Sequence, residues 1–180
     1  MSRITPKPLS SYPWYIRILF RFQTKKYGAP LEPVLLWGRT PKVFLGFLLM
    51  LKALNRKGSP LDASLRALIT TKISQINECA FCIDMNAALF LERGGSEEKI
   101  FSLSKYRQST VYSEREKTSL EYAEAMTISS EKVSDQLFSR LKVHFNEDAI
   151  IELTALIAYQ NLSSKFNSAL KAEAFGFCKR

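Results

Sequence analysis

Apolar residues recur every three or four positions along most of this chain, which is the period of an α-helix and not of a β-strand. The segment 62–76 is the clearest case, and its apolar side is formed by Leu65, Leu68, Ile69 and Ile73. Asp62 or Ser64 can cap the first turn of this helix, because each side chain can accept a hydrogen bond from a free backbone amide. The pattern favours an all-α protein.

Helix-start and helix-stop residues predict further helices after residue 76. One helix opens at Cys79 and ends near Gly94 and Gly95, since glycine favours the backbone conformation that terminates a helix. Ser96 can start a short helix, and Ser113 begins a capping-box sequence with glutamate three residues later. Segments 134–145 and 146–170 then predict two helices that pack as an antiparallel pair. The last one has four apolar residues that we expect to face inward, Ile150, Leu153, Ile157 and Phe166.

The N-terminal third is divided into shorter pieces, because all seven prolines lie within the first 60 residues. Residues 14–26 still predict an amphipathic helix, with Trp14, Ile18 and Phe22 as its apolar stripe. Pro41 suits the first turn of another helix, which continues to Leu54. The whole pattern predicts a helical bundle of about six to eight helices.

The length and composition of the chain limit the class of protein. Its 180 residues suit one domain over 1–180, and 46% hydrophobic with 24% charged residues excludes a disordered chain. The longest apolar run covers nine residues, 43–51, whereas a membrane-spanning helix needs about 20. Three cysteines and an N-terminus without an apolar signal core predict a cytoplasmic, reducing location.

Positive charge is concentrated in the N-terminal third. Residues 1–60 hold eleven basic residues and one acidic residue, whereas residues 61–180 hold fifteen basic and sixteen acidic residues. We expect the basic segment of about residues 1–40 to pack on the core or on a neighbouring subunit, with its charges in solvent. An anionic partner or a membrane surface is the alternative. Nucleic acid is not expected, because no nucleic-acid-binding motif accompanies the charge.

One cluster of residues carries chemistry, and it begins with two cysteines three residues apart. Cys79 and Cys82 lie on one face of the predicted helix, close enough to form a disulfide. Backbone amides at the start of a helix favour a thiolate and lower the thiol pKa. Asn86 lies one turn beyond Cys82 and can donate a hydrogen bond to the sulfur or to a bound oxygen. Glu78, the neighbour of Cys79, is a weaker candidate and is more typical of a helix-start carboxylate.

Three alternatives to a reactive cysteine pair are less favoured. A structural zinc site usually needs four ligands, and Cys178 and His144 are the only further candidates. A thioredoxin fold would need a βαβ pattern, which the chain lacks. Two unreactive core cysteines remain the simplest alternative. His144, near a predicted helix end, suits capping, and Cys178 suits a free thiol near the tail.

Several segments resemble the carboxymuconolactone decarboxylase and alkylhydroperoxidase D-like family. In the first half they are residues 61–66 (LDASLR), 73–77 (ISQIN) and 79–86 (CAFCIDMN). In the second half they are residues 114–116 (ERE), 120–125 (LEYAEA), 151–154 (IELT) and the stretch 161–167. The resemblance covers roughly residues 30–178 and implies an all-α fold that assembles as a homo-oligomer: a trimer, a dimer or a hexamer.

For family members with a paired-cysteine motif, the resemblance implies a thiol-dependent peroxidase or disulfide reductase. The expected substrate is a hydroperoxide or a partner disulfide, the reductant is unknown, and neither a metal nor an organic cofactor is expected. Two positions depart from the usual proton relay of such members. Asn86 stands where a histidine is common, and Ala67 stands where a glutamate is common.

Two other functions stay open. A noncatalytic oligomeric binding protein of the same fold would use the basic N-terminal segment to hold its partner. A lactone decarboxylase-like enzyme is the other, although members with that activity generally lack the cysteine pair. The sequence therefore predicts a thiol oxidoreductase in which Cys79 and Cys82 alternate between dithiol and disulfide.

Overall fold

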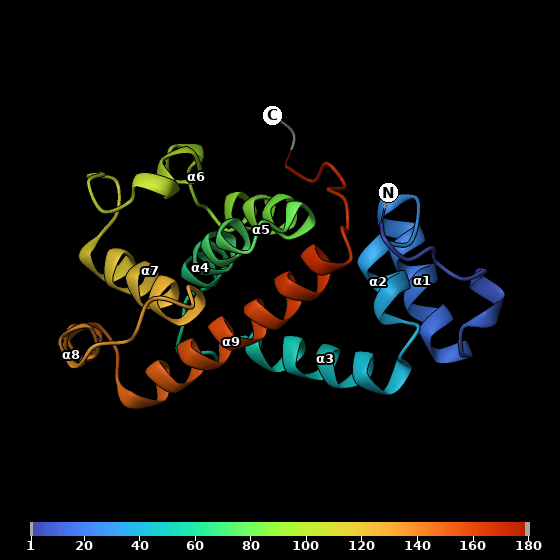
Figure 1. The fold of residues 1–180 in the computed structure, drawn as a ribbon, viewed down its shortest axis with the longest axis horizontal. Helices are drawn as coiled ribbons and strands as arrows, with labels where there is room; N and C mark the ends of the chain where they lie inside the picture. The colour runs from blue at the N-terminus through green and yellow to red at the C-terminus, as the bar shows by residue number, and fades with distance from the viewer. Residues whose placement is uncertain (1, 179–180) are drawn as a thin grey trace.

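The computed structural model describes residues 2–178, and these contain α-helices and two short 3-10 helices but no strand. This part of the chain holds one α-helix more than the upper end of the expected range (Figure 1). Its nine α-helices are α1 Trp14–Tyr27, α2 Glu32–Trp37, α3 Pro41–Leu54, α4 Ala63–Ile76, α5 Ala80–Glu92, α6 Glu97–Ser102, α7 Glu114–Thr127, α8 Asp135–His144 and α9 Glu147–Ala169.

Side-chain caps start most of these helices where the sequence predicts them. The Asp62 carboxylate accepts a hydrogen bond from the backbone N–H of Leu65 at 2.7 Å, so Asp62 and not Ser64 caps α4. Ser113 and Glu116 form the complete capping box of α7, in which each side chain accepts a hydrogen bond from the backbone of the other. The short helix α2 was not predicted, because its six residues show too few periods and, unlike those of α6, have no side-chain cap before them.

The longest helix, α9, runs through the middle of the molecule (Figure 1). Helices α3, α4, α5, α7 and α8 all pack against it. Ile150, Leu153 and Ile157 are buried there, as expected from the sequence. None of the helices in residues 2–178 is long and apolar enough to cross a membrane.

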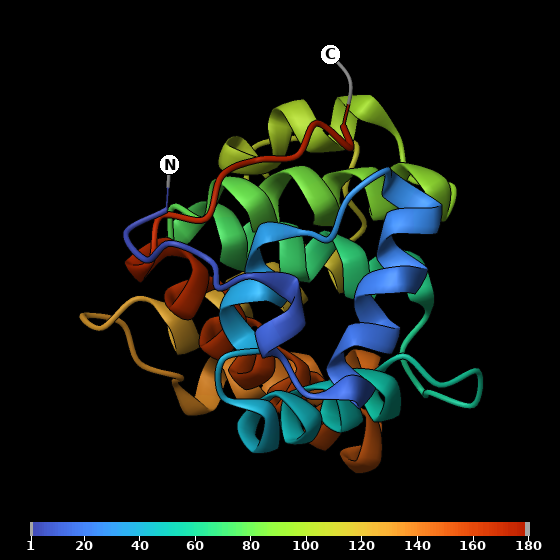
Figure 2. The same cartoon turned by 90° about the vertical axis from the view of Figure 1, so that its right-hand side faces the viewer.

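The basic N-terminal segment lies on the far side of α9 from α7 and α8 (Figures 1 and 2). Its apolar contacts with the core include Trp37, which stacks on Phe166 of α9 with ring centroids 3.7 Å apart. Phe20 is buried within the same group of side chains. The segment therefore closes one side of the bundle.

The helix predicted at residues 14–26 is confirmed, but its stripe of Trp14, Ile18 and Phe22 is not the side that packs on the core. Trp14 and Phe22 are 71% and 68% exposed, and Ile18 is also exposed. Helix α1 instead buries Ile16 and Phe20, which lie on the neighbouring face. The stripe of three large residues suggested the wrong side because a larger apolar residue is not always the buried one.

Helices α4 and α7 are also joined by a buried group of charged side chains. The Lys72 ammonium lies 2.9 Å from the Glu124 carboxylate, and both side chains are about nine-tenths buried. The Tyr106 hydroxyl donates to Glu124 at 2.8 Å, and Arg107 forms a further ion pair with it. Burial opposes ionisation of Glu124, but the hydrogen bonds from Lys72 and Tyr106 and the nearby charges lower its pKa.

Candidate functional site

The turn between α4 and α5 places the two cysteines. The backbone N–H of Cys79 donates to the carbonyl of Ser74, and the N–H of Glu78 donates to that of Gln75, at 3.0 and 3.1 Å. These two bonds form a Schellman motif, a common way to end a helix. Glu78 occupies its left-handed position with φ of 52°, so the exposed Glu78 serves as a turn residue.

Cys79 and Cys82 form a disulfide in the structure, with their Cα atoms 5.2 Å apart. Cys79 is the N-cap of α5, and its sulfur accepts a hydrogen bond from the backbone N–H of Cys82 at 3.2 Å. Both residues are buried, with 1% and 4% of their surface exposed. The expected proximity of the two sulfur atoms and their position at a helix start are therefore observed.

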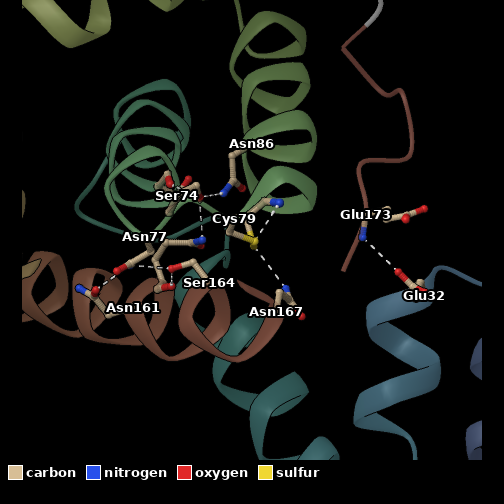
Figure 3. The surroundings of a disulfide bond; sticks show 12 residues. Glu32, Ser74, Asn77, Cys79, Asn86, Asn161, Ser164, Asn167 and Glu173 are labelled. Carbon is tan, nitrogen blue, oxygen red and sulfur yellow. Dashed lines mark hydrogen bonds between the residues drawn. A yellow bond between two sulfur atoms is a disulfide. The ribbon is translucent and has the colours of Figure 1, made fainter. Parts of the chain in front are cut away.

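The amide that donates to the Cys82 sulfur belongs to Asn167, which was not among the predicted site residues. Asn167 on α9 donates from Nδ2 to the Cys82 sulfur at 3.3 Å (Figure 3). The hydrogen bond expected from Asn86 to this sulfur is not formed in the structure, because the Asn86 amide donates to the Ser74 hydroxyl at 3.1 Å. Gln160 donates to the same hydroxyl at 3.0 Å. Asn86 thus holds α5 against α4 beside the cysteines.

The spacing of polar residues in α9 could have revealed that this helix contributes side chains to the site. Gln160, Ser164 and Asn167 recur at helical spacing, and all three are buried. A buried polar stripe needs partners, which in this fold lie on the α4–α5 turn. The Asn77 amide donates to Asn161 at 2.9 Å and to Ser164 at 2.8 Å (Figure 3). This side of α9 therefore anchors the turn that carries the cysteines.

A cavity of about 270 Å³ lies beside the disulfide, between α9 and helices α2, α3, α4 and α5. Cys82 lines this cavity and Cys79 does not, so the two cysteines differ in access. Most of the cavity surface is apolar, and its walls include the rings of Trp37, Phe47 and Tyr159. Although Cys82 is buried from the outer surface, a small molecule in this cavity would contact this residue.

The two positions that lack the usual relay residues both line the cavity. Ala67 lies on α4 and Asn86 on α5, and neither side chain can carry a proton at neutral pH. Glu78 is exposed and is not among the residues that line the cavity, so it does not replace them. Within residues 2–178, no group of three or more Cys, His, Asp or Glu side chains could hold a metal ion.

The C-terminal tail is fastened next to the cysteines through Asp84. The backbone amides of residues 175–178 donate to its carboxylate at 2.6–3.0 Å. Phe177 then packs edge-on against Phe81 and Tyr27, with ring centroids 6.1 and 5.3 Å apart. Burial opposes ionisation of Asp84, but the four amides outweigh it and lower its pKa. The tail covers the outer side of the disulfide region.

We expect the docked tail to depend on pH through Asp84. The pKa of Asp84 in the folded protein lies below the ordinary value of about 3.9. The stabilisation that its carboxylate gives to the docked tail is therefore present above about pH 4 and is lost as the pH falls through the folded pKa. The Asp84→Asn variant should lose it at neutral pH, and hydrogen exchange at the amides of 175–178 should become roughly tenfold faster. Asp135→Asn, at the start of α8, is the matched control. Unchanged exchange in Asp84→Asn would contradict this role.

The fold, the paired cysteines and the sequence together define the class of protein: this chain belongs to the carboxymuconolactone decarboxylase family. The family matches residues 41–125. Over 172 residues the chain is 41% identical to the uncharacterized protein YnjA of Escherichia coli (strain K12). That match covers 96% of this chain and 94% of YnjA.

Solved structures share the fold. One is an alkylhydroperoxidase AhpD core structure, an uncharacterized peroxidase-related protein from Ralstonia eutropha JMP134. It superposes with a TM-score of 0.84 at 21% identity, over 96% of this chain and 92% of that one. The debrominase Bmp8 superposes with a TM-score of 0.80 at 22% identity, over 96% of this chain and 91% of Bmp8. The expected all-α fold of the alkylhydroperoxidase D-like type is confirmed.

Proposed function

We propose that this protein is a thiol oxidoreductase that reduces an organic hydroperoxide, or a partner disulfide, through a dithiol–disulfide cycle of Cys79 and Cys82. The observation that carries the proposal is the position of Cys82, which lies in bonding contact with Cys79 and also lines an apolar cavity. Paired cysteines at a helix start are the arrangement that thiol chemistry requires.

Cys82 is the cysteine that meets the hydroperoxide in this proposal. Its thiolate attacks the terminal oxygen of the hydroperoxide, the O–O bond breaks, and the alkoxide leaves and takes a proton to become an alcohol. Cys82 is then a sulfenic acid. The Cys79 thiol attacks the Cys82 sulfur, the disulfide forms, and the oxygen leaves as water. Two thiols and one hydroperoxide thus give one disulfide, one alcohol and one water.

An external dithiol closes the cycle by thiol–disulfide exchange, so that its two thiols become a disulfide while Cys79 and Cys82 are reduced. The Asn167 amide supports Cys82, since a hydrogen bond to sulfur stabilises the anionic form that reacts. The electrons stay on sulfur throughout, so the cycle needs no cofactor. Such a cycle suits a cytoplasmic, reducing environment, and it is compatible with the homo-oligomer expected from the family resemblance.

Three further functions stay open and differ in what they require. Debromination is the activity named for Bmp8, and the aromatic walls of the cavity favour testing it here. Lactone decarboxylation would not use the thiols, so alkylated protein would keep that activity. A noncatalytic binding protein would show none of these reactions, and its partner would depend on the basic N-terminal segment.

Consumption of cumene hydroperoxide in the presence of a dithiol tests the proposal. We expect wild-type protein to consume it well above the rate of the dithiol alone, and protein alkylated at both cysteines to match that background. The Cys178→Ser variant is the control and should retain the full rate, because Cys178 is free and does not line the cavity. Wild-type protein that never exceeds background with any hydroperoxide or disulfide would refute the proposal.

A further inference from the structure

Three buried side-chain atoms in residues 2–178 have no hydrogen-bond partner, and all three belong to residues that line the cavity beside Cys82. They are Arg66 Nε, the Tyr159 hydroxyl and Asn167 Oδ1. The three residues are 93% or more buried, since only 7%, 5% and 3% of their surfaces are exposed. Buried polar atoms are nearly always paired, so these three atoms are free to pair with the polar groups of a ligand bound in the cavity.

Arg66 determines the charge of that ligand. Its guanidinium donates to the Leu61 carbonyl, and within the described chain it forms no ion pair. The nearest acids are engaged elsewhere: Glu152 pairs with Arg56 at 2.6 Å, and Asp62 pairs with Arg115 at 2.9 Å. A buried arginine stays charged, so its solvation must be replaced by an anion or by strong acceptors.

A second guanidinium lies near the same end of the cavity. Arg93 lines the cavity and donates to the Ala63 carbonyl at 3.0 Å, which ties the end of α5 to the start of α4. Burial, followed by the charge of Arg93, lowers the pKa of Arg66, and the carboxylates of Glu152 and Asp62 offset this only in part. An anion between these two side chains would compensate for the lost solvation of Arg66 and for its repulsion by Arg93.

The cysteine lies at the opposite end of the cavity. Cys82 is near the α4–α5 turn, where Ser74 is eight residues from Arg66 along α4. A helix rises about 1.5 Å per residue, so these two levels are about 12 Å apart. The wall between them is formed largely by apolar and aromatic side chains, among them Phe47, Leu51 and Leu89.

From this arrangement we propose that the cavity binds an elongated organic acid with an apolar, preferably aromatic, body, whose carboxylate lies at Arg66 and whose other end lies at Cys82. Tyr159 is placed to donate to a polar group of the ligand, and Asn167 Oδ1 to accept from one. The assignment of the end at Cys82 as the reacting end rests on the proposed thiol function. The binding of the acid does not depend on that function.

The cavity volume supports an organic ligand over hydrogen peroxide. One water molecule needs only about 10–15 Å³ of such cavity space, and hydrogen peroxide is not much larger, whereas this cavity offers about 270 Å³. A molecule of the size of a substituted benzoate would fill it and cover the apolar walls. Hydrogen peroxide would leave both the apolar walls and Arg66 without contacts.

Binding of para-isopropylbenzoate to the wild-type protein, measured by calorimetry, tests the proposal without any turnover. We expect it to bind at least about tenfold more tightly than the neutral para-isopropylbenzamide, because only the acid forms charge-assisted hydrogen bonds with Arg66. Arg66→Gln should reduce the affinity for the acid to that for the amide. Arg140→Gln, a surface arginine on α8 away from the cavity, should leave it unchanged.

Protection from alkylation locates the bound acid. In reduced protein, saturating para-isopropylbenzoate should slow alkylation of Cys82 by a maleimide and leave alkylation of Cys178 unchanged. The comparison of acid with amide on wild-type protein needs no variant, so it decides the question even if Arg66→Gln does not fold. Equal affinity for acid and amide, or no protection of Cys82, would overturn the proposal.

Kinetics separate this inference from the proposed function. If the enzyme reduces hydroperoxides, the para-carboxylate of cumene hydroperoxide should have a KM about tenfold below that of cumene hydroperoxide itself, and Arg66→Gln should remove the difference. Acid binding without any hydroperoxide reduction would support the ligand site and refute the thiol peroxidase. Hydroperoxide reduction without preference for the acid would refute the ligand site alone.

Discussion

Replacing Cys82 with serine should reduce hydroperoxide consumption to the background rate, a loss of at least about a thousandfold. A serine hydroxyl is a much weaker nucleophile than a thiolate, and Cys82 is the cysteine that lines the cavity. The measurement is the initial rate with cumene hydroperoxide and a dithiol.

Replacing Cys79 should have a different consequence, and this asymmetry identifies the attacking cysteine. Without added dithiol, Cys79→Ser retains the nucleophile but cannot form the disulfide, so each protein should consume about one equivalent of hydroperoxide and keep the sulfenic acid. Mass spectrometry should find the sulfenic acid on Cys82. Both variants are best made in a Cys178→Ser background, so that the tail cysteine cannot form a disulfide instead. The opposite assignment would follow if Cys82→Ser showed the single turnover.

Removing the buried carboxylate of Glu124 should produce a large loss of stability. Glu124→Ala leaves the Lys72 ammonium buried without its partner and breaks the hydrogen bond from Tyr106. Removing one member of a buried ion pair typically costs about 3–5 kcal/mol in the free energy of unfolding. Chemical denaturation monitored by circular dichroism measures this loss in the free energy of unfolding.

Glu121 provides a matched control, since it is the same residue type one turn earlier on α7. It pairs with Arg140 at 2.7 Å, but the two side chains are 32% and 47% exposed. Exposed pairs contribute about 0–1 kcal/mol, so Glu121→Ala should change stability little. The double variant Lys72→Met with Glu124→Leu should recover most of the loss, because no charge is then left buried. Equal effects of Glu121→Ala and Glu124→Ala would contradict the role assigned to the buried pair.

Much of the helical framework could be predicted because it depends on local rules. Asp62, Ser96 and Ser113 all cap helices where their sequences indicate, since capping involves residues within one turn. The orientation of α1 could not be predicted, because Ile16 and Phe20 are selected by contacts with α2 and α3. Those contacts join residues from separate helices, which no local pattern records.

The candidate site was predictable only in part, for the same reason. Cys79 and Cys82 are neighbours in sequence, and their meeting follows from the helix that they start. Asn167 is 85 residues from Cys82, so its hydrogen bond depends on how α9 packs against α5. The cavity likewise exists only once several separate segments are assembled, and the unpaired Nε of Arg66 could not be inferred before that.

The turn that ends α4 also limits how the chain can change length. Glu78 is the single residue between the C-cap Asn77 and the N-cap Cys79, so the two helices share one connection without slack. Each residue inserted or deleted there would rotate α5 by about 100° about its axis. Such a rotation would direct Cys82 away from the cavity while both helices stayed intact. Substitution of the exposed Glu78 is therefore tolerable, but a change of even one residue in the length of this turn is not.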